Sequence, residues 1–257
     1  MIRSRKGFCA LKGYQWLLFG MLLVAPPFSP DAFAEEGKTA GVVELFTSQG
    51  CSRCPPADEI LSELAERKDM VVLAYHVSYW DYLGWKDEFA TPENTARQRD
   101  YENVLNTSVY TPQAVINGGF SEVGSDREAL LSLLETHAPL PVDVELSYKE
   151  KSLVIDVGSS STVEPAADTH VVLVYYRPRQ AVAIREGENA GREIVYRNIV
   201  TDFQTVGMWH GEPLRLELPM SQVKKKGGGC AVLLQSVGEP GNPGPILGAA
   251  NREVETR

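Results

Sequence analysis

The chain has 257 residues, with 25 lysines and arginines, 34 aspartates and glutamates, and a formal net charge of −9 at pH 7. This acidic balance argues against nucleic-acid and anionic-membrane binding, because both need clustered positive charge. The length is sufficient for one large domain or two small ones. The four cysteines include one closely spaced pair, so stability must come from ordinary hydrophobic cores rather than a disulfide framework.

The first 34 residues have the three regions of a signal peptide. A basic opening at residues 3–12 is followed by an apolar stretch at 16–25, which is too short to span a bilayer. Ala32-Phe33-Ala34 has small residues at both positions that a signal peptidase reads. We therefore expect cleavage after Ala34 and a periplasmic or secreted protein that is not in the membrane after cleavage. The alternative is an uncleaved N-terminal anchor.

Residues 35–138 are predicted to form an α/β domain. Continuous apolar runs indicate strands, and apolar residues at helical spacing, such as Ile60, Leu61 and Leu64, indicate helices. The expected elements are strands over Val42–Phe46, Met70–Val77, Ala114–Asn117 and Phe120–Val123, and helices over Ala57–Lys68, Pro92–Asn106 and Asp126–His137. The order β-α-β-α-β-β-α is that of the minimal thioredoxin-like fold.

Cys51-Ser-Arg-Cys54 lies between the first predicted strand and the first predicted helix. In this context a CxxC spacing is typical of a redox pair. The helix N-terminus and the cation of Arg53 would stabilise a thiolate. We expect Cys51 to be the exposed nucleophile and Cys54 to resolve the mixed disulfide that Cys51 forms.

A CxxC pair also occurs in metal sites and as a permanent structural disulfide. A four-cysteine zinc site is excluded, because the remaining cysteines are Cys9 and Cys230 and there is no second CxxC. A permanent structural disulfide would close too small a ring to restrain the unfolded chain much. A Cu(I) site using both cysteines and His76 stays open, as does an inactive remnant. His76 ends a predicted buried strand, so a structural role is favoured over a ligand or proton carrier.

A cluster of aromatic residues follows the second predicted strand. Rigid aromatic rings suit the wall of a substrate pocket, and Arg97 and Arg99 would add cations from the next helix. The alternative is a loop whose rings are buried in the core. The cluster consists of Tyr79, Trp80, Tyr82 and Trp85.

Thr111-Pro112 precedes the third predicted strand, where thioredoxin-like proteins place a cis-proline facing the CxxC motif. This resemblance implies a cis bond beside Cys51 that would hold the substrate backbone. The alternative is an ordinary trans-proline at the start of a strand.

Residues 139–257 are predicted to form a β-rich, sandwich-like domain after the linker Pro139-Leu140-Pro141. Short strands separated by glycine, proline and charged turns are typical of such a fold. Gly187–Gly191 is expected to be a hairpin or long turn. Gly227-Gly228-Gly229, which follow Lys224-Lys225-Lys226, are expected to form a flexible, exposed turn.

Long sequence strings resemble a bacterial family of secreted, thioredoxin-like proteins, catalogued as domain of unknown function 1223. The strings cover residues 43–58, 76–87, 97–99, 109–113, 187–192 and 196–200. The chain departs from the family at Ser78, where aspartate is usual. The resemblance implies the fold and export, but no settled reaction.

The leading functional hypothesis is thiol–disulfide exchange with exported proteins or small thiols, as a possible thiol–disulfide oxidoreductase. Cys51 and Cys54 would react, and Thr111, Pro112 and the aromatic cluster would bind substrate, without a cofactor or metal. The alternatives are a periplasmic Cu(I)-handling protein and a non-enzymatic binding module whose β-rich domain carries the partner. The sequence does not indicate an oligomeric state.

Overall fold

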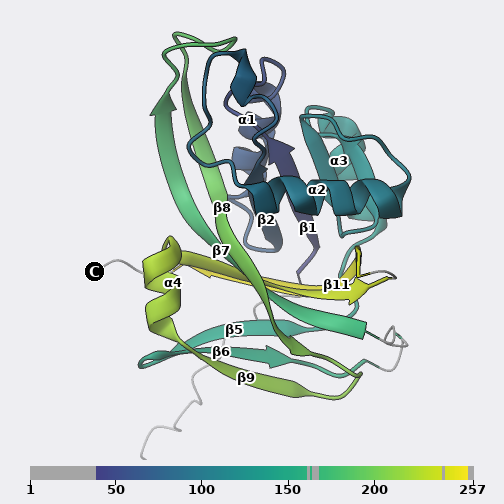
Figure 1. Cartoon of the computed structure of the whole chain (residues 1–257). Coiled ribbons are helices and arrows are strands. Elements are labelled where there is room, and N and C mark those ends of the chain that lie inside the picture. The colour runs from purple at the N-terminus through teal and green to yellow at the C-terminus, as the bar shows by residue number, and fades with distance from the viewer. Residues whose placement is uncertain (1–38, 161–162, 164–167, 239–240, 254–257) are drawn as a thin grey trace, which may run out of the picture. The chain divides into compact units, whose positions relative to one another are not determined.

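The protein has a mixed α/β fold with one large sheet, as seen in a computed structural model (Figure 1). The structure describes residues 39–160, 163, 168–238 and 241–253. The predicted signal peptide at residues 1–34 lies outside the described residues. No helix within the described part of the chain is long and apolar enough to cross a membrane.

The seven elements expected between residues 40 and 138 are present in the predicted order. They are β1 (Gly41–Thr47), α1 (Pro55–Leu64), β2 (Met70–His76), α2 (Pro92–Leu105), β3 (Gln113–Ile116), β4 (Phe120–Val123) and α3 (Arg127–Thr136). Strand β1 pairs in parallel with β2 and antiparallel with β3, which pairs antiparallel with β4. A short 3-10 turn, Asp81–Leu83, lies between β2 and α2.

Strands β1 and β2 are buried along their whole length, which explains their largely apolar sequences. One face of the sheet packs against α1 and α3, where Val43 and Leu45 contact the cluster that includes Leu61 and Leu130. The other face carries Val42 and Phe46 and contacts α2 and the second half of the chain. Alternate residues of one strand therefore contribute to two cores.

The second half of the chain is β-rich, as predicted. Its strands are β5 (Val144–Lys149), β6 (Ser152–Val157), β7 (Asp168–Ala183), β8 (Glu193–Met208), β9 (Leu214–Pro219), β10 (Gly229–Val237) and β11 (Pro243–Glu253). Strands β5, β6 and β9 form a small sheet. This sheet shares a core with β7 and β10, to which Leu153, Leu173 and Val232 contribute. The two sheets thus pack face to face.

The large sheet crosses the predicted domain boundary between residues 138 and 139. Its strand order is β11-β10-β7-β8-β2-β1-β3-β4, and β8 pairs with β2 through Ala74 and Ile199. The described residues, 39–253 with their gaps, belong to one compact unit. The two predicted domains therefore share one sheet.

Two elements of the second half differ from the prediction. Helix α4 (Met220–Lys226) was not expected, and the glycine turn that follows it is partly buried rather than exposed. The helix buries Met220 and Val223, and its lysines lie at the C-terminal end, where the helix dipole favours positive charge. Strand β11 was not expected, because Pro243, Gly244 and Pro245 suggest a turn; an edge strand tolerates prolines.

Candidate redox site

Cys51 and Cys54 are joined by a disulfide, with their Cα atoms 5.4 Å apart, at the junction of β1 and α1. Cys54 is the N-cap residue of α1, and Pro55 follows it in the first turn, where proline needs no hydrogen-bond acceptor. Cys51 lies in the preceding turn, where the Cys54 amide donates to the Cys51 carbonyl at 3.2 Å. Arg53 is exposed between the two cysteines.

The sequence predicted an exposed Cys51, but in the disulfide form this residue is buried. Cys51 is 2% exposed and Cys54 is 0% exposed. The cause is coverage of the CxxC loop by two segments that the sequence separates widely. One is the aromatic segment 79–85, and the other is the loop between β7 and β8.

Thr111 contacts both the disulfide and the aromatic segment. Its carbonyl oxygen lies 3.8 Å from Cys51 Sγ, and its hydroxyl accepts a hydrogen bond from Trp80 Nε1 at 2.7 Å. The peptide bond between Thr111 and Pro112 is cis, as the resemblance implied. The structure therefore brings Thr111 and Pro112 to the cysteine pair, as the sequence predicts.

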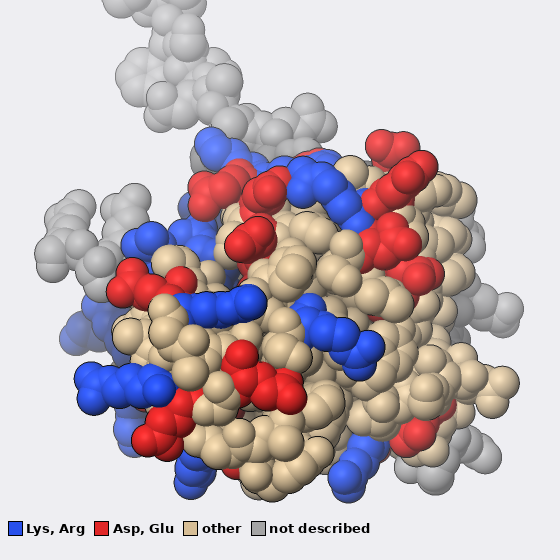
Figure 2. Space-filling model, turned by 90° about the horizontal axis from the view of Figure 1, so that it is seen from above, with Lys and Arg blue, Asp and Glu red and all other residues tan. Residues whose placement is uncertain are grey.

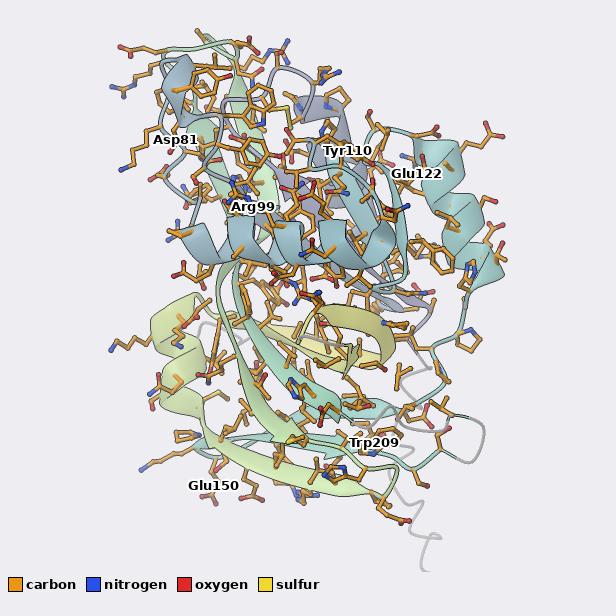
Figure 3. The ribbon with its side chains drawn as sticks, turned by 45° about the vertical axis from the view of Figure 1, so that its right-hand side comes forward. Asp81, Arg99, Tyr110, Glu122, Glu150 and Trp209 are labelled. Carbon is orange, nitrogen blue, oxygen red and sulfur yellow. A yellow bond between two sulfur atoms is a disulfide. The ribbon has the colours of Figure 1, made fainter. Side chains whose placement is uncertain are left out.

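The aromatic segment is partly buried and partly exposed. Tyr79, Trp80 and Trp85 are half-buried, whereas Tyr82 is 78% exposed. Trp85 Nε1 donates to Gln49 Oε1 in the CxxC loop at 2.7 Å. Hydrogen bonds from the indole nitrogens of Trp80 and Trp85 thus hold the aromatic segment against Thr111 and the CxxC loop. In Figure 3, Asp81 marks this segment and Arg99 lies on α2.

Asn189, in the loop between β7 and β8, completes the cover. Its side-chain Nδ2 donates to the carbonyls of Gln49 and Cys51, both at 2.9 Å. Gly187 in the same loop has a φ of +75°, and a Cβ atom there would lie 3.0 Å from Trp85 Cβ. Figure 1 shows the tips of β7 and β8 beside α1. Sequence reasoning assigned Asn189 to a turn and missed this contact.

A buried ion pair lies next to the CxxC loop. His76 Nδ1 and Asp87 Oδ2 are 2.7 Å apart, and both side chains are fully buried. Asp87 also accepts from the amides of Gln49 and Phe89. Burial opposes the charged imidazole, but Asp87 and Asp58 outweigh it and raise the pKa of His76. His76 Nδ1 is therefore partnered, whereas its Nε2 is buried without a hydrogen-bond partner among the described residues.

Asp58 is a second buried acid at the site, and sequence reasoning missed it. It follows Cys54 by four residues, so both side chains lie on one face of α1. Thr47 Oγ1 donates to Asp58 Oδ1 at 2.8 Å, whereas Oδ2 has no hydrogen-bond partner among the described residues. Burial raises the pKa of Asp58 to about 7, and the charge of His76 only partly offsets this.

Arg97, which we expected to supply a cation to the pocket, points into the core instead. Its Nε donates to Glu44 Oε1 at 2.7 Å, and its Nη2 donates to Gln235 Oε1 at 3.0 Å. Tyr101 donates its hydroxyl proton to the second Glu44 oxygen. A carboxylate on a buried strand needs such partners. Arg99 is exposed on α2.

Within the described ranges, no three His, Cys, Asp or Glu side chains come together in a way that could hold a metal ion. The third cysteine in these ranges, Cys230, is buried in β10 and is not disulfide-bonded.

The fold and site define a mixed α/β protein with a covered CxxC disulfide. The chain belongs to the family described as protein of unknown function (DUF1223), whose model matches residues 42–235. A crystal structure of a protein from Agrobacterium tumefaciens is similar, with 41% identity and a TM-score of 0.76, covering 86% of this chain and 97% of that one. HBP35 of Porphyromonas gingivalis shares the fold at 11% identity and a TM-score of 0.60, covering 85% and 76% of the two chains. No curated protein matches the sequence.

Proposed function

We propose that this protein is an exported thiol–disulfide exchange protein built on a thioredoxin-like scaffold. The observation that carries the proposal is the Cys51–Cys54 disulfide at the N-terminus of α1, beside Thr111 and Pro112. The element order from β1 to α3 and the strand order β2-β1-β3-β4 support the thioredoxin-like assignment. The signal-like segment at residues 1–34 supports export, into a compartment where disulfides persist.

The proposed reaction has two steps. In the reduced protein, the Cys51 thiolate attacks a substrate disulfide, forms a mixed disulfide and releases one substrate thiolate. Cys54 then loses its proton and attacks Cys51 Sγ, which closes the Cys51–Cys54 bond and releases the second substrate thiolate. Two electrons pass from the protein to the substrate. In the reverse direction, the protein disulfide oxidises a substrate dithiol.

The N-terminus of α1 supports the first step, because its unpaired amides and positive dipole end stabilise a thiolate. The Thr111 carbonyl lies 3.8 Å from Cys51 Sγ and Trp80 is hydrogen-bonded to Thr111, which supports a role for Thr111 and Pro112 in holding the substrate backbone. Tyr82 is the most exposed ring of the aromatic segment and would contact the substrate. Because Cys51 is 2% exposed, exchange requires the covering side chains to move.

The test is the reduction potential of the pair together with single-turnover exchange on a peptide disulfide. Cys54→Ser should accumulate the mixed disulfide, and Cys51→Ser should not react. Cys230→Ser is the matched control, because Cys230 is buried away from the pair, and it should behave as the wild type. A pair that stays oxidised in excess dithiothreitol, or a reduced pair that does not react with peptide disulfides, would refute the proposal. Tight Cu(I) binding without exchange would instead favour the metal-handling alternative.

A further inference from the structure

Three acidic side chains are buried in the described part of the chain, and they differ in how their oxygens are partnered. Glu44 accepts hydrogen bonds from a buried arginine and a tyrosine. Asp87 accepts from a histidine and from two backbone amides. Asp58 Oδ1 accepts from Thr47 at 2.8 Å, whereas Asp58 Oδ2 has no partner within the described ranges. A buried acceptor without a donor is rare in folded proteins and needs an explanation.

Asp58 lies one helical turn after Cys54 on α1. The Asp58 amide donates to the Cys54 carbonyl at 3.1 Å, and residues four apart on a helix share a face. Cys54 is 0% exposed and Asp58 is 2% exposed, so both side chains face the interior. A disulfide sulfur has no proton to donate, but a Cys54 thiol is a hydrogen-bond donor. Reduction of the disulfide thus creates a donor on the face of α1 that carries the free Asp58 acceptor.

His76 and Tyr196 bring two more unpartnered polar atoms to this region. Thr47, which donates to Asp58, is the register partner of His76 in the β1–β2 pair, and residues directly opposite in paired strands project to the same face. The Tyr196 ring from β8 packs against the His76 ring, with their centroids 4.7 Å apart. His76 Nε2 and the Tyr196 hydroxyl are both buried without a hydrogen-bond partner in the part of the chain that the structure describes. Asp58 therefore belongs to a buried polar cluster next to Cys54.

Buried groups, more than exposed ones, control the protonation of Asp58. Burial raises the pKa of Asp58 to about 7, the charge of His76 partly offsets this, and Asp87 adds to it. The half-buried Arg197 on β8 is paired with Glu66 at 2.9 Å. Exposed charges of both signs are interspersed over the end of the molecule seen in Figure 2, where water and salt screen them. Those that border Asp58 are Glu59, Glu63, Glu66, Arg179, Arg192 and Glu193.

We propose that Asp58 is the proton carrier of the cysteine pair, an inference that deepens the proposed exchange function and rests on it. When the mixed disulfide is resolved, the proton of the Cys54 thiol passes to Asp58 Oδ2 and the Cys54 sulfur attacks Cys51 Sγ. The substrate thiolate leaves with the electron pair of the broken bond. In the reverse direction, the Asp58 carboxyl protonates the Cys54 thiolate as the disulfide opens. His76 is a positioning residue, held by Asp87, whose positive charge favours the Asp58 carboxylate.

The chemistry suits neutral pH. A proton acceptor is most effective when its pKa lies near the working pH, and the pKa of Asp58 is about 7. Glu44 cannot take this role, because its carboxylate is paired with Arg97 and alternate residues of β1 place it on the opposite face from Thr47. Asp87 is held by His76 at 2.7 Å.

Reaction of the reduced protein with an equimolar amount of 5,5′-dithiobis(2-nitrobenzoate) tests this proposal. Attack by Cys51 releases one coloured thiolate and attack by Cys54 on the mixed disulfide releases the second, so stopped-flow absorbance records the two steps separately. In the wild type, the rate of the second step should rise with pH through a midpoint near 7 and then level off. Asp58→Asn should slow the second step at neutral pH by at least about tenfold and remove this midpoint. The first step should stay near the wild-type rate.

Two further variants separate proton transfer from a structural effect. Glu63→Gln is the matched control, because Glu63 is an exposed acid of the same helix, and it should keep the wild-type pH profile. His76→Gln should move the midpoint to higher pH, because Asp58 then loses the positive charge that favours its ionised form.

A wild-type second step without a midpoint between about pH 5 and pH 9 would overturn the proposal. An unchanged second step in Asp58→Asn, or equal slowing of both steps, would also overturn it, since a structural role would affect both. The outcome is separable from the proposed function. A wild-type protein that releases no second thiolate refutes the exchange function and this inference with it, whereas a normal second step in Asp58→Asn refutes only this inference.

Discussion

Asn189 donates a hydrogen bond to the backbone carbonyl of Cys51 at 2.9 Å, although 138 residues separate them in the chain. The same amide group reaches the carbonyl of Gln49. The second half of the chain therefore helps to hold the CxxC loop. This contact, with the aromatic segment, explains why the disulfide is covered.

Asn189→Ala should make the cysteine pair more reactive. The substitution removes two hydrogen bonds to the CxxC loop, which should lower the free energy of unfolding by about 1–3 kcal/mol. The reduced variant should react with iodoacetamide several-fold faster than the reduced wild type, because Cys51 becomes easier to reach. Glu188→Ala is the control, since Glu188 is exposed in the same loop. An unchanged alkylation rate would show that Asn189 does not restrict access.

Asp58→Asn should stabilise the protein increasingly as the pH rises. The pKa of Asp58 is raised to about 7 in the folded protein, against an ordinary value of 3.8. The neutral Asp58 carboxyl therefore makes its full contribution to the free energy of unfolding below about pH 4. This contribution is lost as the pH rises through 7. The Asp58→Asn variant has no carboxyl to ionise at this position, so its stability does not fall in this way.

Urea unfolding at pH 4 and pH 8 measures this effect. The stability of Asp58→Asn relative to the wild type should rise between these two pH values by on the order of 4 kcal/mol. Glu59→Gln, an exposed neighbour on α1, should show no comparable rise. A difference between Asp58→Asn and the wild type that is constant with pH would contradict a buried, neutral Asp58.

Arg97→Ala should destabilise the protein by about 3–5 kcal/mol, because it leaves the buried Glu44 carboxylate without its positive partner. Arg99→Ala, two residues further along α2, should change stability by no more than about 0.5 kcal/mol, since Arg99 is exposed. Chemical denaturation of the two variants gives the comparison. Equal effects would mean that the Glu44–Arg97 pair adds little to stability.

Mass spectrometry of the exported protein tests the signal-peptide prediction. Expression of the full chain in a bacterial host should give a mature protein that begins at Glu35, because Ala32-Phe33-Ala34 has the pattern of a cleavage site. Ala34→Leu should block or shift the cut, whereas Phe33→Leu should not. A protein that retains Met1 would contradict the prediction.

The sequence predicted the elements from β1 to α3 well, because each depends on local patterns of apolar residues. The resemblance to thioredoxin-like proteins, rather than a local pattern, placed Thr111 beside Cys51. The sequence did not predict that β8 pairs with β2 through Ala74 and Ile199, because such pairing depends on residues distant in the chain. The contact between Asn189 and the CxxC loop was missed for the same reason.

Asp58 was missed for a different reason. Asp58 lies four residues after Cys54, in the first turn of a helix. An aspartate at such a position ordinarily stabilises the helix through its dipole. Only the packing of α1 shows that its carboxyl is buried. Arg97 was misassigned because a charged residue on a polar helix is usually exposed. Here Arg97 is buried instead and forms an ion pair with Glu44 on β1.

Two substitutions in the aromatic segment separate binding from structure. Tyr82 is 78% exposed, so Tyr82→Ala should leave the melting temperature nearly unchanged. If Tyr82 contacts the substrate, the same change should slow exchange with a peptide disulfide several-fold. Exchange with the small 2-hydroxyethyl disulfide should stay at the wild-type rate, because this molecule is too short to reach Tyr82 from Cys51.

Trp80→Ala should affect both properties. Trp80 is half-buried and donates a hydrogen bond to Thr111, so its loss should cost up to about 3 kcal/mol, below the 3–5 kcal/mol for a fully buried aromatic residue. Trp80→Phe keeps the packing but removes the hydrogen bond. If Trp80 positions Thr111 for substrate, Trp80→Phe should slow peptide exchange without a matching fall in stability. A loss of stability in Trp80→Ala, with wild-type exchange per folded molecule in both variants, would show that the segment is part of the core and not a substrate wall.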